Sequence, residues 1–113
     1  MSNQVRYNWS GIYHQLSAQL EASSDAGMRE RYALDCATLL ADRMADRQSA
    51  IELLVRIGSE RASLRLADRL GSLYEELGDS EASYDWLLEA MDMAEGDELQ
   101  RLRVRCARTA LDG

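Results

Sequence analysis

Apolar side chains, mostly leucine and alanine, recur every three or four positions along nearly the whole chain. This spacing gathers them on one face of an amphipathic α-helix, whereas a half-buried strand would alternate at every second residue. The pattern predicts six helices, over about residues 8–23, 26–44, 47–57, 61–77, 80–95 and 98–111. The connections are short, so neighbouring helices are expected to run antiparallel. The expected fold is all-α and built from helix hairpins.

Two of the breaks between these helices share one chemical pattern, a glycine followed by an aspartate. Gly78 can adopt the left-handed conformation that ends a helix, and Asp79 can cap the next one by accepting free backbone N–H groups. Gly96 and Asp97 repeat this arrangement, and Gln100 completes a capping-box pattern three residues later. The chain is therefore expected to turn sharply at both places.

Three other breaks are marked by different residues. Asp25 and Asp46 are N-cap candidates for the helices that follow them. Gly58 with Ser59 is interpreted as a further break, because glycine weakens a helix and serine favours its start.

An internal repeat pairs an apolar residue with a very small one, followed by a bulkier or apolar residue one turn later. The copies are Cys36-Ala37 with Leu40, Leu70-Gly71 with Tyr74, and Cys106-Ala107 with Ala110. They start 34 and 36 residues apart, which is the period of a helix-hairpin solenoid. Ala50, Leu54 and Ile57 return as Ser83, Leu87 and Ala90, a shift of 33. A small residue lets a neighbouring helix approach closely, and stacked hairpins bury the faces that one hairpin leaves exposed.

The stretch Leu70-Gly71-Ser72-Leu73-Tyr74, with Gly78-Asp79 and then Ser83, Leu87 and Ala90, resembles a tetratricopeptide repeat. The resemblance implies a short right-handed solenoid in one domain, residues 1–113. Its expected parts are an N-terminal helix or cap (1–30), a degenerate repeat (31–63), the best-matching repeat (64–97) and a terminal helix (98–113). Ala67, Ser83 and Glu95 depart from the family pattern, which has a large aromatic, alanine and often proline there. A helical bundle without repeats is the alternative.

Composition narrows the function classes. The chain has 113 residues, one domain's worth, with 46% hydrophobic and 29% charged residues, as in globular proteins. A net charge of −7 disfavours nucleic acid and anionic lipid as partners, and the apolar runs are too short to span a bilayer. With two distant cysteines and no secretory signal at its start, the chain is expected in the cytoplasm.

The residue inventory argues against catalysis. His14 is the single histidine, so a site built on two histidines is excluded within one chain. Cys36 and Cys106 occupy the inward position of the repeat and are expected to be buried, unreactive and too far apart for a disulfide. Phosphate-binding loops and nucleophile elbows are absent from the sequence. We expect no enzyme activity, cofactor or metal.

The charge is concentrated in one segment. From Glu75 to Glu98 there are ten acidic residues and no basic one. Four of them are spaced to share a helix face: Glu81, Asp85, Glu89 and Asp92. This acidic face either favours solubility or docks a basic partner. Arg101, Arg105 and Arg108 form a basic stripe that can pair with it, within the chain or between chains.

The resemblance also implies a ligand groove lined by the first helices of the repeats. Its expected residues are Arg31, Leu34, Thr38, Arg65, Asp68, Ser72, Glu75, Arg101, Val104 and Arg108. The lysine and asparagine clamp that binds peptide C-termini in chaperone adaptors is missing, since its positions hold Leu34, Thr38, Asp68 and Ser72.

Both ends of the predicted solenoid carry apolar residues. Tyr7, Trp9 and Tyr13 either cap the first hairpin or form an exposed patch, and Val104 and Leu111 point away from the apolar face of the last helix. A homodimer that buries one or both ends is one hypothesis. The function expected overall is a protein-protein interaction module, such as an adaptor, chaperone or assembly factor. The alternative is a self-associating structural protein with no separate ligand.

Overall fold

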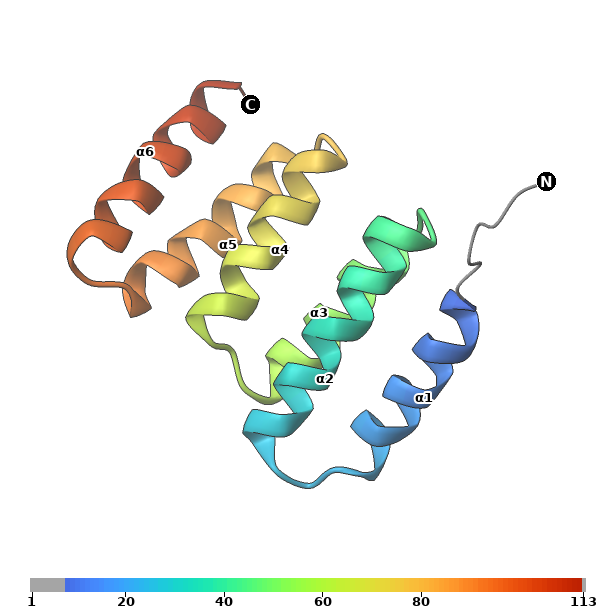
Figure 1. Ribbon diagram of the computed structural model, residues 1–113. Helices are drawn as coiled ribbons and strands as arrows, with labels where there is room; N and C mark the ends of the chain where they lie inside the picture. Colours follow the sequence, from blue (N-terminus) through green and yellow to red (C-terminus); the bar gives the residue numbers. More distant parts are fainter. Residues whose placement is uncertain (1–7, 113) are drawn as a thin grey trace. The chain divides into compact units, whose positions relative to one another are not determined.

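The computed structural model describes residues 8–112, and all regular structure in that range is helical (Figure 1). The α-helices are α1 (Trp9–Ala22), α2 (Ala26–Thr38), α3 (Arg47–Glu60), α4 (Leu64–Glu76), α5 (Ser80–Met93) and α6 (Gly96–Asp112). A π-helical segment, η1 (Leu39–Arg43), continues α2. The predicted all-α fold with six helices is confirmed for the described residues.

The chain divides into two compact units, residues 1–50 and residues 51–113. In the first unit, α1 packs against α2, and η1 contacts both helices. Its buried apolar residues include Leu20, Ala33, Cys36, Ala37 and Leu40. The predicted assignment of residues 1–113 to one domain with repeat boundaries at 31, 64 and 98 stays a prediction.

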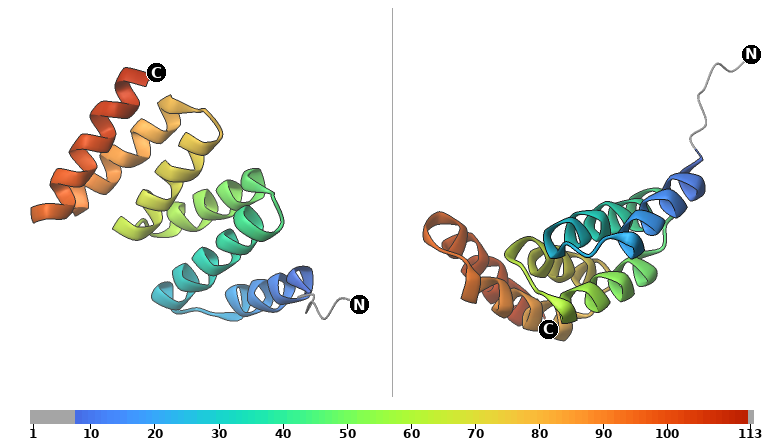
Figure 2. Two further views of the ribbon diagram at one scale, coloured as in Figure 1. Left: turned by 45° about the horizontal axis from the view of Figure 1, so that its top comes forward. Right: turned by 90° about the horizontal axis from the view of Figure 1, so that it is seen from below.

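In the second unit, α5 contacts both α4 and α6 (Figures 1 and 2). Leucines dominate the α4 side of this core, where Leu66, Leu70 and Leu73 are buried. A connected cluster extends from α4 through α5 to α6, and it comprises Ala67, Leu87, Ala90, Ala94, Leu102 and Cys106. At Ala67, a fully buried alanine takes the position where the resemblance expects a large aromatic.

Gly71 lies at a close contact between α4 and α5. A Cβ atom added there would lie 2.9 Å from Cδ2 of Leu87, so a larger residue would force the helices apart. The Ser83 hydroxyl, fully buried, donates a hydrogen bond of 2.7 Å to the Gly71 carbonyl oxygen. The small-residue packing predicted from the repeat is therefore present at Gly71. The hydroxyl bond also explains why serine at this position is compatible with burial.

Three predicted N-caps are confirmed. The carboxylates of Asp25, Asp46 and Asp79 each accept a hydrogen bond from the backbone N–H three residues later. Gly78 and Gly96 both have positive φ, at 81° and 61°, as predicted. The start of α6 differs, since the helix begins at Gly96 and holds Asp97 in its first turn.

The predicted break at Gly58 and Ser59 is wrong, because α3 continues through both residues to Glu60. A Cβ atom at Gly58 would lie 2.9 Å from Cδ2 of Leu66, so this glycine serves close packing inside a helix. The break comes at residues 61–63, and the Ser63 hydroxyl caps α4 by accepting from the Leu66 N–H.

Candidate functional site

A polar arrangement in the second unit joins α4 to α6. The Arg105 guanidinium on α6 forms an ion pair with Asp68 on α4 through Nη1, and its Nη2 donates to the Ser72 hydroxyl at 2.9 Å. Asp68 and Ser72 lie one helical turn apart on the same face of α4, so a single planar guanidinium reaches both. Arg105 is thereby held in one orientation between the two helices.

This ion pair is half-exposed, with 32% of the Arg105 side chain and 39% of the Asp68 side chain accessible to solvent. At such exposure, water and salt screen the attraction, so the pair contributes at most about 1 kcal/mol to folding. The ion pair therefore acts mainly by fixing the orientation of Arg105. A partly accessible cation in a fixed orientation can bind a further anionic or polar group.

Three hollows in the surface meet at Arg105. One, of about 450 Å³, is lined by Ser72, Glu75, Glu76 and Arg105. A second, of about 390 Å³, is lined by Gln100, Arg101, Val104 and Arg105. The third, of about 220 Å³, is lined by Asp68, Glu98, Arg101, Leu102 and Arg105. We call this surface the α4/α6 groove.

The wall of the second hollow is almost entirely apolar, although two arginines line it. Their methylene stems and Val104, which is 58% exposed, supply that surface. An apolar side chain of a ligand can therefore lie beside the guanidinium groups of Arg101 and Arg105. The other two hollows add the carboxylates of Glu75, Glu76 and Glu98, so the groove presents both charges.

The structure brings half of the predicted groove residues together, and these are Asp68, Ser72, Glu75, Arg101 and Val104. Arg65 on α4 and Arg108 on α6 are exposed on the same two helices. The remaining three lie on α2 in the first unit, where Arg31 and Thr38 are exposed and Leu34 is half-buried. The Thr38 hydroxyl donates to the Leu34 carbonyl oxygen at 3.0 Å.

Arg105 was missing from the predicted groove, although it is the residue common to the three hollows. A signal for it was present in the sequence. The repeat aligns Leu70 with Cys106, so the turn of α6 beside Asp68 and Ser72 contains Arg105. Its ion pair with Asp68 on α4 also shows that this member of the basic stripe pairs with α4 within the chain, not with the acidic face of α5.

The acidic face lies on the outer side of α5. Glu81, Asp85, Glu89 and Asp92 are all exposed. The opposite side of the helix is buried through Ser83, Leu87 and Ala90. Burial of that side therefore holds α5 in place despite repulsion among the carboxylates. Its predicted role in binding a basic partner stays a prediction.

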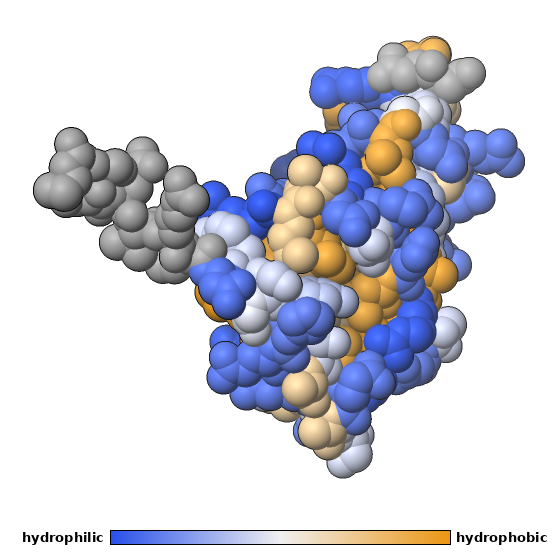
Figure 3. Space-filling model, turned by 90° about the vertical axis from the view of Figure 1, so that its right-hand side faces the viewer, coloured by the Kyte–Doolittle hydropathy of each residue, from blue (hydrophilic) through white to orange (hydrophobic). Residues whose placement is uncertain are grey.

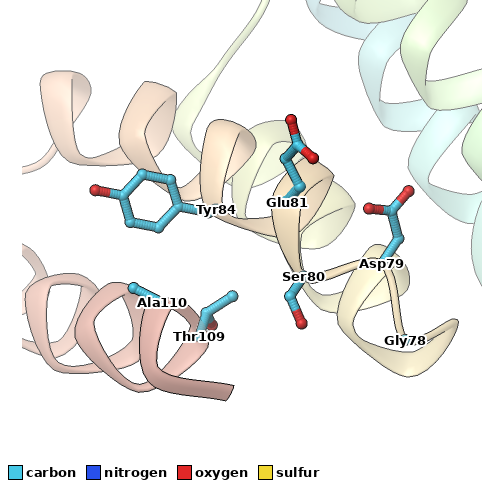
Figure 4. A pocket seen from close by; sticks show the side chains of 7 residues that line it. All are labelled: Gly78, Asp79, Ser80, Glu81, Tyr84, Thr109 and Ala110. Atoms are coloured by element: carbon cyan, nitrogen blue, oxygen red, sulfur yellow. The ribbon is translucent and has the colours of Figure 1, made fainter. Parts of the chain in front are cut away.

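A further hollow, of about 560 Å³, lies between the start of α5 and the end of α6 (Figure 4). It is lined by Gly78, Asp79, Ser80, Glu81, Tyr84, Thr109 and Ala110. Figure 4 shows the carboxylates of Asp79 and Glu81 pointing away from α6. Asp79 caps α5, and the Thr109 hydroxyl donates to the Arg105 carbonyl oxygen. Two of its polar groups are thus occupied by the backbone of the chain.

The two cysteines are free, buried thiols. Burial raises the pKa of the Cys36 thiol to about 11, with a smaller contribution from the nearby Asp35 carboxylate, and burial also raises the pKa of Cys106. His14 is exposed on α1 and contacts Tyr13, with ring centroids 5.6 Å apart. Across residues 8–112, no cluster of three or more His, Cys, Asp or Glu side chains is arranged to hold a metal ion.

The aromatic residues near the start of the chain are partly covered within the first unit. Trp9 and Tyr13 are half-buried, and the Arg43 guanidinium lies over the Trp9 ring, 5.1 Å from its centroid. Tyr7 lies outside the described residues. Ile12 on the same helix is exposed. Figure 3, which shows the side of the molecule at the right of Figure 1, displays apolar surface between polar side chains.

Comparisons with known proteins identify no relative. No family model matches the sequence, and searches of curated proteins and of solved structures found no match. None of the described helices has the length and apolar character needed to cross a membrane.

Proposed function

We propose that this chain is a protein-interaction module whose α4/α6 groove binds a segment of a partner protein. The observation that carries the proposal is the Arg105 guanidinium, held by Asp68 and Ser72 where three surface hollows meet. Binding without catalysis is part of the proposal. It is supported by the burial of both thiols and by their raised pKa, since the thiolate is the reactive form.

The resemblance to tetratricopeptide repeats supports the same surface. In that family, ligands lie in a groove lined by the first helix of each hairpin, and α4 and α6 correspond to first helices in the repeat alignment. The groove lining favours a ligand segment with an acidic side chain next to an apolar one. The acidic group pairs with Arg101 or Arg105, and the apolar group occupies the hollow at Val104.

The test begins with capture of partners from a native lysate and mapping of the bound segment to a synthetic peptide. Affinity is then measured by fluorescence anisotropy for the wild type and for Arg105→Gln. Because the variant removes a preorganised cation at the centre of the groove, we expect binding about tenfold weaker or worse. Thermal unfolding should change little, since the ion pair is half-exposed.

The matched control is Arg61→Gln, which neutralises an exposed arginine of the second unit that does not line the three hollows. It should leave the affinity unchanged. Equal affinity of the wild type and Arg105→Gln for the mapped peptide would contradict the groove as the binding surface.

A further inference from the structure

The outer face of α6 carries the most exposed large apolar side chains of the described residues. Val104 is 58% exposed and Leu111 is 87% exposed. With the exposed Ala107 between them, their spacings of three and four residues place all three on one face of the helix. The opposite face is buried through Leu102, Cys106 and Thr109. We call Val104, Ala107 and Leu111 the α6 stripe.

Arginines flank the α6 stripe on both sides. Arg103 and Arg108 are exposed and project to either side of it at the helical spacing of 100° per residue. Between Leu99 and Leu111 the sequence has four arginines and no acidic residue. Arg101 and Arg105 line the groove, and the other two, Arg103 and Arg108, make the flanks of the stripe cationic, although the whole chain has a net charge of −7. At physiological salt the Debye length is about 8 Å, so a docking partner senses mainly this local charge.

From this pattern we infer that the outer face of α6 binds an acidic amphipathic helix of a partner protein. Such a helix covers the α6 stripe with its own apolar residues and places carboxylates against Arg103 and Arg108. The outer face of α6 is distinct from the α4/α6 groove, because Arg103, Ala107 and Leu111 do not line the hollows of the groove. Val104 borders both surfaces. The inference therefore does not rest on the proposed function.

A second copy of the chain fits the α6 stripe less well. Pairing α6 with α6 brings the flanking arginines of both copies together, which is repulsive. Pairing α6 with the acidic face of α5 sets Asp85 and Asp92, near the centre of that face, against the apolar stripe. Carboxylates desolvated against valine and leucine lose hydration without gaining a partner. The α6 stripe is instead complementary to a helix face with an apolar centre and acidic flanks.

The test uses a synthetic amphipathic peptide of leucine and glutamate, about four helical turns long. Titration into isotopically labelled full-length protein is followed by amide chemical shifts, which report where the peptide binds. We expect shifts along α6 from Arg103 to Leu111. We expect about tenfold weaker binding for Arg103→Glu and for Leu111→Ser, because the first reverses a contacting charge and the second removes the most exposed apolar contact.

Arg61→Glu is the matched control, since it reverses the charge of an exposed arginine that lies outside α6, so it should retain wild-type affinity for this peptide. The inference is overturned by no binding, by shifts confined to α5 or to the α4/α6 groove, or by affinity that Arg103→Glu and Leu111→Ser leave unchanged. Concentration-dependent sedimentation of the protein alone that Leu111→Ser abolishes also overturns it, in favour of a second copy as the occupant.

Discussion

The turn that follows η1 and the turn that follows α4 use the same arrangement at positions 33 residues apart. In the second turn, Gly78 has φ 81° and Asp79 caps α5. In the first, Ala45 has φ 52° and Asp46 caps α3. A non-glycine residue thus occupies the left-handed conformation in one copy, at a cost of about 1 kcal/mol. The first turn carries strain that the second avoids.

The two turns also differ in length by one residue. The Asp79 N–H donates to the carbonyl oxygen of Tyr74, five residues earlier, whereas the Asp46 N–H donates to that of Leu40, six residues earlier. The sequence repeat shows the same difference, since the first helices are 34 residues apart and the second helices 33. The extra residue is accommodated by η1, where the Met44 N–H donates to Leu39, one position beyond α-helical spacing. The one-residue change in repeat offset therefore coincides with this π-helical segment.

The largest predicted effect concerns the small residue that precedes each turn, Ala37 in the first copy and Gly71 in the second. Gly71→Leu is expected to destabilise the protein by about 1–3 kcal/mol, because even a Cβ atom there meets the Leu87 side chain. The change is measured by urea unfolding. Leucine at the exposed Ala18 on α1 serves as the control and should cost far less. An unchanged unfolding midpoint for Gly71→Leu would refute the close α4–α5 contact.

A smaller effect tests the two left-handed residues directly. A Cβ atom at Gly78 meets nothing within 4 Å, so Gly78→Ala acts through the backbone alone and should cost about 1 kcal/mol. The reciprocal change, Ala45→Gly, should stabilise the protein by about 0.5 kcal/mol, since glycine relieves the strain but adds freedom to the unfolded chain. Both free energies come from urea unfolding at neutral pH. If the two variants shift stability in the same direction, the comparison of the turns fails.

The sequence predicted the features that depend on neighbours a few residues away. Asp25, Asp46 and Asp79 were recognised as caps because a cap and its N–H donor lie three residues apart. Gly58 was misread as a break because its contacts with Leu66 and Trp86 arise only once the helices pack. A glycine that ends a helix and one that permits close packing look alike in sequence.

The candidate site shows the same limit over a longer distance. Its α4 and α6 residues were placed by the repeat offset, which predicts which helices neighbour each other. Arg105 was assigned to the basic stripe and not to the groove, because its partners Asp68 and Ser72 are 37 and 33 residues away in sequence. The alignment gives the facing turns, but the choice among several arginines on one helix depends on side-chain geometry.

The smallest predicted effect distinguishes the two capping aspartates. The Ser49 hydroxyl donates to Asp46 Oδ2 at 2.7 Å, while the equivalent position after Asp79 is Ala82, which has no side-chain donor. This bond and the Ser49 backbone N–H lower the pKa of Asp46, because both favour the charged carboxylate.

A lowered pKa in the folded state stabilises the protein at pH values above the pKa of the unfolded state, near 3.8. That contribution is lost as the pH falls through the pKa of the folded state. Ser49→Ala should therefore raise the pKa of Asp46 towards its ordinary value, because only the backbone N–H bond remains. Carboxyl chemical shifts followed by NMR from pH 2 to 6 measure the change, with Ser59→Ala as the control, because the Ser59 hydroxyl donates to the Arg56 carbonyl and contacts no cap. An Asp46 pKa that stays unchanged in Ser49→Ala would show that the Ser49 hydroxyl does not lower the pKa of this cap.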